Sequence, residues 1–265
     1  MRIVSLVDNV PGRCPGEHGL SLWLELDSGL RILFDTGQGG LFLENATALG
    51  IDVADAGMLV ISHGHYDHGG GLRAFFESNT KARAYVREQA FEDHFSLKEE
   101  GLKYIGIGSD VPGGRLVFTT ACEEIAPGVT LFSDVADEFP APAGNARLFG
   151  PDRKRPDDFD HEQNMLIKDG GNSVLVAGCA HKGVLNILER GEELNGGPLD
   201  YMVCGMHLMK CTAPGSVESL ASDLIGHAKC RFITMHCTGF ENFSLMKGVM
   251  GDRISYLASG ETVEL

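Results

Sequence analysis

The sequence lacks the features that mark membrane proteins and nucleic-acid-binding proteins. No apolar run approaches the roughly 18 residues needed to span a membrane. Lys and Arg together number 22 against 37 Asp and Glu, which gives a formal net charge of −15. A surface that binds nucleic-acid phosphates or anionic lipids needs basic residues in excess. We therefore expect no nucleic-acid or membrane partner but a small-molecule substrate, an anionic one if a basic pocket forms locally.

The sequence also lacks the cysteine pattern of a secreted, disulfide-bonded domain. It has seven Cys, an odd number, and no C-x-x-C pair. The first residues have no apolar stretch typical of a signal peptide and predict a strand instead. No P-loop or dinucleotide-binding fingerprint is present. We therefore expect a cytoplasmic protein with free thiols.

Apolar runs bounded by turn residues predict most of the secondary structure. Strands are expected at residues 2–8, 20–26, 30–34, 58–61, 115–119, 129–132, 164–168, 173–177, 201–204, 231–235 and 254–257. Helices are expected at residues 43–49, 72–77, 84–95, 183–194, 216–228 (with Ser216 as the cap) and 243–250. Residues 140–158 predict an exposed loop. This order predicts an α/β (α+β) fold in which two sheets face each other with helices outside.

The densest group of potential metal ligands follows the predicted strand at residues 58–61. His63, His65, Asp67 and His68 come within six residues, and three Gly follow them. Burying so many polar groups without partners would cost on the order of several kcal/mol each. An extended turn places His63 and His65 on one side, and Asp67 and His68 then face a second position. The H-x-H-x-D-H spacing therefore predicts two neighbouring metal ions.

This motif and its setting resemble the metallo-β-lactamase superfamily. The resemblance covers nearly the whole chain, from Asp35-Thr-Gly37 to His236. It implies a four-layer αββα sandwich with the metals at one edge, between the two sheets. Residues 1–265 are accordingly expected to form a single metallo-β-lactamase-like domain, with a variable insertion at about 101–160 that shapes the substrate pocket.

The resemblance implies further metal ligands at the ends of later strands. His161 precedes a strand at the place of the third ligand of the first metal, and His236 follows a strand at the place of the last ligand. Hydrolases of this superfamily usually carry a metal-bridging Asp where this chain has Cys179. Cys179 is either a ligand, which would favour zinc, or a small buried apolar residue. His181 either replaces Cys179 as a ligand or contacts the ligands without binding the metal itself. Asp35 is expected to hold the motif loop by hydrogen bonds.

Five other residues receive weaker assignments. His207 follows a predicted strand and is expected to contact the substrate or a phosphate, or else to be an ordinary core histidine. Glu17 and His18 are expected near the entrance of the pocket. His94 and His227 lie on predicted helices and are expected to be ordinary surface or boundary residues.

Six segments occur together in one group of this superfamily. They are Glu17-His-Gly-Leu-Ser21, Asp35-Thr-Gly-Gln38, Ser62-His-Gly-His-Tyr-Asp-His68, Asp160-His-Glu-Gln163, Gly178-Cys-Ala-His181 and Gly205-Met-His-Leu208. They resemble the dihydropterin–ribofuranosylaminobenzene 5′-phosphate synthase-like proteins. Archaeal members are linked to methanopterin synthesis, in which a dihydropterin methyl group is joined to an arylamine with loss of pyrophosphate. Many other members are known only as metal-dependent hydrolases, so the group does not fix the substrate.

The resemblance therefore implies a binuclear centre of two divalent metal ions, zinc in the first place and iron or manganese as alternatives. The predicted ligands are His63, His65, Asp67, His68, His161, Cys179 and His236. The candidate catalytic residues are Asp67, His181 and His207. The two metals would share a water whose pKa falls toward ~7, and Asp67 would help to orient the resulting hydroxide.

Three functions are compatible with this site. The leading hypothesis is a hydrolase that uses a metal-bound hydroxide on an ester, thioester, lactone or phosphate ester. The first alternative is a dihydropterin–arylamine transferase, in which the metals activate a pyrophosphate leaving group and an amine replaces water. The second alternative is a non-catalytic metabolite sensor that binds its ligand without consuming it.

Overall fold

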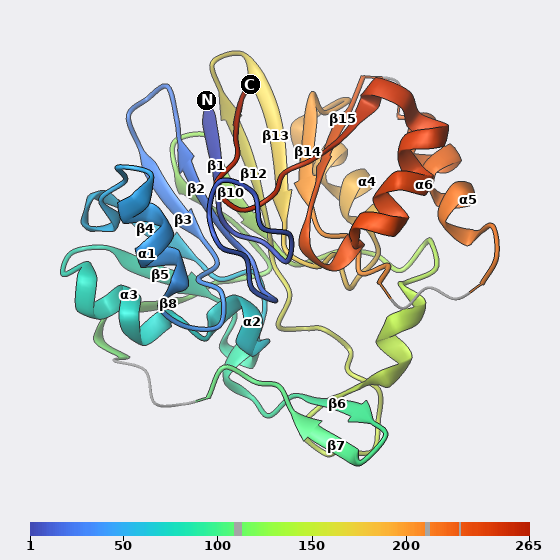
Figure 1. Cartoon of the computed structure of the whole chain (residues 1–265), viewed down its shortest axis with the longest axis horizontal. Coiled ribbons are helices and arrows are strands. Elements are labelled where there is room, and N and C mark those ends of the chain that lie inside the picture. The colour runs from blue at the N-terminus through green and yellow to red at the C-terminus, as the bar shows by residue number, and fades with distance from the viewer. Residues whose placement is uncertain (109–112, 210–212, 228) are drawn as a thin grey trace.

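The structure is a computed structural model that describes residues 1–108, 113–209, 213–227 and 229–265. Two sheets stand between two layers of helices (Figure 1). Helices α1 (Leu41–Ala48) and α3 (Leu72–Ser78) cover the first sheet. Helices α4 (Val184–Asn195), α5 (Ser216–Ile225) and α6 (Phe240–Met250) cover the second. The predicted αββα sandwich is confirmed.

The first sheet changes from antiparallel to parallel pairing along its width. Among the described residues it has seven strands, in the order β17-β1-β2-β3-β4-β5-β8. They are β17 (Thr262–Glu264), β1 (Arg2–Val7), β2 (Ser21–Glu25), β3 (Arg31–Phe34), β4 (Met58–Val60), β5 (Arg83–Val86) and β8 (Leu116–Phe118). Neighbouring strands among β3, β4, β5 and β8 pair in parallel, so the carboxyl ends of these four strands share one edge of the sheet. The His-rich motif follows β4 at that edge, and its second half forms the short helix α2 (Tyr66–Gly69).

The second sheet has the same mixed character. Within the described ranges its seven strands run in the order β16-β15-β14-β13-β12-β10-β9. They are β16 (Ile254–Tyr256), β15 (Arg231–Thr234), β14 (Tyr201–Cys204), β13 (Asn172–Ala177), β12 (Asn164–Asp169), β10 (Val129–Phe132) and β9 (Cys122–Ala126). Strands β13 to β16 are parallel. The loops that carry Cys179, His207 and His236 follow β13, β14 and β15 in turn, so the parallel pairing brings them together at one edge.

The core lies in three layers that follow the alternation of side chains along the strands. On β2, Leu22 and Leu24 pack toward the second sheet, and Trp23 packs toward the helices on the opposite face. Val176 of β13 and Val203 of β14 meet the first sheet in the central layer. Each fully buried apolar side chain of this size contributes roughly 1.5–3 kcal/mol, so the two sheets form a rigid frame for the loops at their edge.

The helix predicted at residues 84–95 is wrong. This stretch contains β5, a short 3₁₀ turn (Glu88–Phe91) and the start of β6 (Phe95–Lys98). Ala84 and Val86 are fully buried on one face of β5, which pairs in parallel with β4. Burial and pairing in the sheet outweigh local helix propensity here. As a result His94 is not a helix-surface residue but is only 2% exposed.

A three-stranded sheet projects from the sandwich and was not predicted. It consists of β6, β7 (Gly101–Tyr104) and β11 (Leu148–Phe149), in the order β11-β6-β7. The β6–β7 hairpin extends below the two main sheets in Figure 1. It lies partly within the predicted variable insertion. The loop expected at residues 140–158 also contains a 3₁₀ turn (Ala143–Arg147).

Two smaller expectations differ at helix ends. Ser216 is the first residue of α5 rather than its cap, because Gly215 occupies the cap position and the Ser216 hydroxyl donates to the carbonyl of Ala213. Residue 228, the expected end of this helix, lies outside the described residues, as does Cys211. None of the helices in the described ranges is both long and apolar enough to cross a membrane.

Candidate metal centre

A buried carboxylate fixes the motif loop after β4. Asp35 accepts hydrogen bonds from the backbone N–H of Ser62 and from its hydroxyl, each at 2.7 Å. It also accepts from Nδ1 of His68 at 2.7 Å. All three residues are fully buried. Asp35 therefore orients the loop as expected, and it leaves Nε2 of His68 pointing away from the carboxylate.

Hydrogen bonds also set the proton position on His63. The Ser62 hydroxyl donates to Asp35, so it accepts from Nδ1–H of His63 at 2.8 Å. This leaves an unprotonated Nε2 on His63, and that atom is buried without a partner. A neutral imidazole with a free Nε2 lone pair is the form that binds metals.

Two asparagines set the proton position on two histidines in loops that follow strands of the second sheet. Asn145 donates its amide N–H to the carbonyl of His181, so its amide oxygen accepts from Nδ1–H of that ring at 2.9 Å. The amide oxygen of Asn9 accepts from Nδ1–H of His236 at 2.8 Å. Nε2 of His181 is buried without a partner. Both rings therefore present an Nε2 lone pair, as His63 does.

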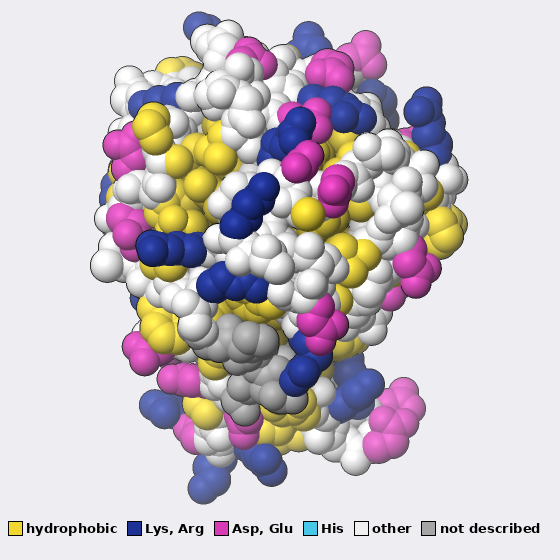
Figure 2. Space-filling view, turned by 90° about the vertical axis from the view of Figure 1, so that its left-hand side faces the viewer, with side chains coloured by type: hydrophobic (Ala, Val, Ile, Leu, Met, Phe, Trp, Pro, Cys, Tyr) yellow, Lys and Arg dark blue, Asp and Glu magenta, His cyan; other side chains and the backbone are white. Residues whose placement is uncertain are grey.

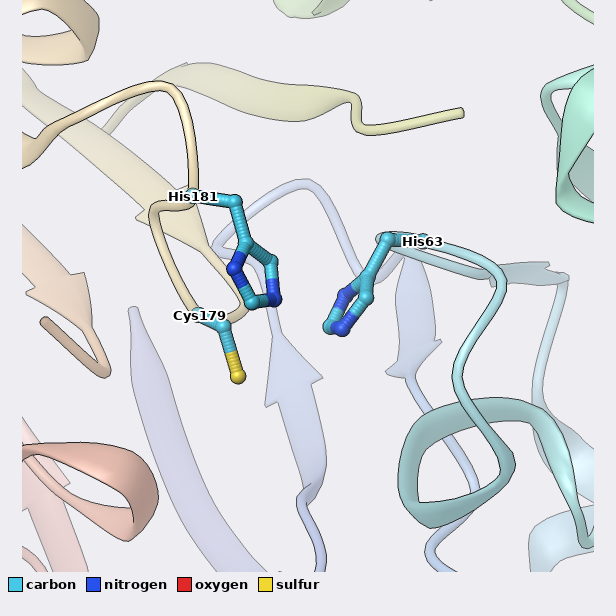
Figure 3. A group of neighbouring side chains, drawn as sticks. All are labelled: His63, Cys179 and His181. Carbon is cyan, nitrogen blue, oxygen red and sulfur yellow. The ribbon is translucent and has the colours of Figure 1, made fainter. Parts of the chain in front are cut away.

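The free ligand atoms converge on the Cys179 thiol. Sγ of Cys179, Nε2 of His68 and Nε2 of His236 form one group, with 3.2 Å from Sγ to His68 and 3.1 Å between the two imidazoles. Cys179 also forms a group with His63 and His181, in which all ligand atoms lie within 4.8 Å of one another. Figure 3 shows His63 facing Cys179 and His181 across a small gap. Two ligand groups thus share one sulfur.

The loop after β13 reaches this position because of a glycine. A Cβ on Gly178 would collide with the Ser62 hydroxyl, so only glycine permits the close approach of the two loops. The adjoining backbone is strained: Ala180, His207 and His236 have φ values of 53°, 49° and 50°. Such conformations are unfavourable for residues other than glycine and tend to cluster at functional sites.

The ionisation of the cluster fits a cation better than protons. Burial, and then the neighbouring imidazoles, hold the pKa values of His63 and His181 well below the usual value. Burial lowers the pKa of His236 to about 4. Burial also lowers the pKa of His68, but the Asp35 carboxylate outweighs it and raises that pKa to about 9. Burial raises the pKa of the Cys179 thiol, so a thiolate there requires a positive neighbour.

Asp67 and His65 complete the edge of the two groups. Oδ2 of Asp67 lies 3.5 Å from Nε2 of His236 and 4.0 Å from Nε2 of His68. Burial alone would raise the pKa of Asp67, but its hydrogen bond with His18 at 3.1 Å and the other imidazoles lower it. His65 is 5% exposed, and its Nε2 has no partner. Its ring packs against that of His181, with 5.1 Å between the ring centroids.

His161 has a different arrangement from the other histidines. Its Nδ1 accepts a hydrogen bond from the backbone N–H of Gly64 at 2.9 Å. The proton of the neutral ring therefore lies on Nε2, which faces Oδ1 of Asp157 at 3.4 Å. His161, Asp157 and His65 form a group apart from Cys179. Nε2 of His161, like that of His181, has no hydrogen-bond partner among the described residues, but His181 and not His161 groups with Cys179, which favours His181 in the first ligand group.

Of the residues that support the centre, Asn9, Asn145 and Asp157 were not singled out in the sequence, and His94 was expected to be an ordinary surface or boundary residue. Nδ1 of His94 donates to Oδ2 of Asp157 at 2.9 Å, and Oδ1 of Asp157 lies 3.4 Å from Nε2 of His161. Asn9 and Asn145 orient His236 and His181. Single asparagines in irregular segments carry no periodic signal, so only the structure brings them to the site.

A cavity of about 160 Å³ opens onto the ligand groups. Among the residues lining it are His18, Asp67, Cys179, His207 and His236. His207 is half-buried, its Nδ1 has no partner, and its ring lies 4.3 Å from that of His181. The expected positions of His18 and His207 near the pocket therefore agree with the structure, whereas Glu17 accepts a hydrogen bond from the backbone N–H of Gln38. Figure 2 shows a different side of the molecule, where basic and acidic side chains are mixed and no histidine is visible.

The sequence model of the metallo-β-lactamase superfamily matches residues 15–225. The chain belongs to this superfamily. The match includes the whole motif loop and the loop with Cys179. The superfamily typically binds divalent metals.

Relatives from one archaeon, Methanocaldococcus jannaschii, are similar over nearly their full length. The uncharacterized protein MJ0448 is 27% identical over 246 residues, which cover 89% of this chain and 90% of that protein. The 7,8-dihydropterin-6-methyl-4-(β-D-ribofuranosyl)-aminobenzene-5′-phosphate synthase is 26% identical over 266 residues, which cover 94% of this chain and 90% of that protein.

Solved structures agree with the fold. Tm1679, described as a metal-dependent hydrolase of the β-lactamase superfamily, has a TM-score of 0.83 and 27% identity, and the match covers 100% of this chain and 99% of that one. Zn²⁺-bound PqqB from Methylobacterium extorquens has a TM-score of 0.61 and 14% identity, with full coverage of both chains. The second likeness concerns the fold alone. The predicted superfamily and its fold are confirmed.

Proposed function

We propose that this protein is a metal-dependent hydrolase of a small ester, thioester, lactone or phosphate ester, with a binuclear centre built around Cys179. The observation that carries the proposal is the convergence of four histidine side chains, His63, His68, His181 and His236, on one sulfur. Histidines in a hydrophobic core normally find hydrogen-bond partners for both nitrogens. In the described part of the chain, the buried Nε2 atoms of His63, His65, His161 and His181 have none.

The ligand sets that fit best differ slightly from the sequence prediction. His63, His181 and Cys179 would hold the first metal, and the ring of His65 lies beside that of His181 with 5.1 Å between the centroids. His68, His236, Asp67 and Cys179 would hold the second. Imidazole and thiolate ligands together suit zinc. We assign His161 to the support of the motif loop, because its Nδ1 accepts from the N–H of Gly64 and its ligand group does not include Cys179.

Metals held there would lower the pKa of a bound water and polarise the oxygen of the bond to be cleaved. The residues of the chain supply the surrounding functions. The ionised Asp67 accepts a hydrogen bond from His18 and can accept another from a nucleophilic water. The free Nδ1 of His207 is suited to hold a substrate oxygen or a proton of the leaving group. Tyr66, Ile105 and Leu148 line the cavity and limit the access of bulk water.

The transferase is the second candidate, because the similar archaeal synthase covers almost the whole chain. In that reaction an amine would replace water and pyrophosphate would leave. The two functions use the same ligand sets, and they differ in the acceptor that enters the cavity. The metabolite sensor is a third hypothesis, and it predicts binding without turnover.

The test combines metal analysis with a substrate panel. Protein purified without added metal should contain up to two metal ions, and the His63→Ala variant should contain fewer. The control is His227→Ala, which removes a half-buried histidine paired with Glu192 away from the centre. The wild type should hydrolyse at least one member of a panel of 4-nitrophenyl acetate, a thioester, a lactone and bis(4-nitrophenyl) phosphate.

Each alternative has its own outcome in this test. Absence of hydrolysis across the panel, combined with pyrophosphate release when an arylamine is supplied with a pyrophosphate ester, would replace the hydrolase by the transferase. Tight binding of a ligand that is recovered unchanged would favour the sensor. Equal metal content in the wild type and the His63→Ala variant would refute the metal centre itself.

A further inference from the structure

The β6–β7 hairpin presents two lysines to the cavity above the metal centre. Lys98 and Lys103 both line this cavity, together with Ser96. Ser96 and Lys103 are directly paired across the two strands, and Lys98 lies two residues from Ser96 on β6. Because side chains alternate along a strand, all three project from the same face of the hairpin. Lys98 and Lys103 therefore lie on the face of the hairpin that lines the cavity.

No carboxylate in the described part of the chain neutralises the charges of these two lysines. Among the described residues, no carboxylate forms an ion pair with Lys98 or Lys103. Of the described side chains that line the cavity, Asp67 is the carboxylate, and it already pairs with His18 at 3.1 Å. The formal net charge of the whole chain is −15, so this positive cavity runs against the general charge of the molecule. Such a local reversal attracts and orients anions.

The rest of the cavity wall is mostly apolar between the hairpin and the metal ligands. Tyr66, Ile105, Leu148 and Met209 line it. Apolar walls with a few directed polar groups are typical of sites for small organic molecules. The ligand that suits this surface has an apolar body, a reactive bond at the metal centre and a negatively charged group at the hairpin.

We propose that the substrate carries a phosphate monoester, remote from the bond that is cleaved, which Lys98 and Lys103 hold. The inference rests on the proposed function, because it assigns the bond to be cleaved to the metal centre. Two ammonium groups on adjacent strands match a dianion better than a single negative charge, and lysine binds phosphate as a point charge. The two lysines are thus specificity-determining residues.

Binding of phenyl phosphate to the zinc-loaded protein tests the anion site without any turnover. The Lys98→Ala/Lys103→Ala variant should bind phenyl phosphate more weakly. Its dissociation constant, measured by calorimetry, should rise about tenfold, as expected for the loss of two partly exposed ion pairs. The Lys98→Arg/Lys103→Arg variant should restore most of the affinity. The matched control is Lys81→Ala/Lys229→Ala, which removes the same charge from exposed lysines away from the cavity and should change the constant by less than about twofold.

Two binding results would overturn the assignment. An unchanged constant in the Lys98→Ala/Lys103→Ala variant would mean that phosphate binds to the metals alone. An equal loss of affinity for benzoate would mean that the lysines recognise any anion rather than a phosphate monoester. Circular dichroism of each variant verifies that the hairpin substitutions leave the fold intact.

Kinetics separates this inference from the hydrolase proposal. In the wild type, 4-acetoxyphenyl phosphate should have a lower KM than phenyl acetate, and the lysine substitutions should raise KM for the phosphorylated ester only. If neither ester is cleaved but phenyl phosphate binding still depends on the lysines, the hydrolase fails and the anion site stands. If both esters are cleaved equally and the substitutions change neither, the anion site fails and the hydrolase stands.

Discussion

His161 and His181 are buried to the same extent, each 1% exposed, but their hydrogen bonds run in opposite directions. Nδ1 of His181 donates to Asn145, which leaves Nε2 free beside Cys179. Nδ1 of His161 accepts from the N–H of Gly64, which places its proton on Nε2 toward Asp157. The comparison teaches that the tautomer set by the neighbouring groups, rather than proximity to the motif, decides which histidine can bind a metal.

Substitution of His181 gives the largest expected effect. His181→Ala should lower the first metal's occupancy and reduce hydrolysis by more than about 100-fold, beyond the range usual for residues that only support a ligand. Inductively coupled plasma mass spectrometry and panel turnover measure the two quantities. If His161→Ala loses the metal and His181→Ala retains it, the roles of the two histidines are reversed.

Removal of the shared sulfur should affect both ligand groups. Cys179→Ala should reduce the metal content and lower activity by about 100-fold, because each group loses one ligand. Cys179→Asp should recover part of the metal content, since a carboxylate can also bridge two cations. The matched control is Cys230→Ala, which removes another fully buried thiol away from the centre. Full metal content in the Cys179→Ala variant would show that the sulfur is only a packing group.

The asparagine that sets the tautomer of His181 should have a smaller effect. Asn145→Leu removes the acceptor of Nδ1–H, and we expect metal affinity to fall about 10- to 100-fold at the first group. Competition with a chromophoric chelator measures the affinity. Asn195→Leu, at the end of α4, is the control for loss of a partly buried amide. If the metal affinity from chelator competition equals that of the wild type, the hydrogen bond from His181 to Asn145 does not contribute to metal binding.

Substitution of His161 should act on stability rather than on the metal. His161→Ala leaves the N–H of Gly64 without its partner and removes one neighbour of Asp157, which should lower the free energy of unfolding by about 1–3 kcal/mol. Urea unfolding of the metal-free protein measures this change. We expect the metal content of the folded variant to stay close to that of the wild type, and a loss of one metal ion would argue for His161 as a ligand.

The sequence predicts the metal ligands better than the residues that hydrogen-bond to those ligands. The spacing of His63 to His68 and the positions of Cys179 and His236 after strands indicate ligands at one sheet edge, and the structure brings them together. Asn145 and Asp157 lie in irregular segments far from the motif in sequence, so no period or spacing marks them. The tautomers of His161 and His181 depend on these partners, so the sequence assigned His161 as a ligand and left open only whether Cys179 or His181 is one.

The hairpin shows the same limit for the fold. Residues 84–95 have helical spacing, but pairing of β5 with β4 overrides it. The strands that place Lys98 and Lys103 side by side pair across a turn, and neither has a strong apolar pattern. Recognition of the lysine pair required the register of β6 and β7, which a sequence pattern does not supply.

X-ray absorption at the zinc K-edge tests the central claim most directly, because it detects whether sulfur binds the metal. The zinc-loaded wild type should show a zinc–sulfur distance of about 2.3 Å beside a shell of nitrogen and oxygen ligands. This sulfur shell should disappear in the Cys179→Ser variant and persist in the Cys230→Ser variant. A wild-type spectrum with nitrogen and oxygen ligands alone would contradict a metal centre built around Cys179.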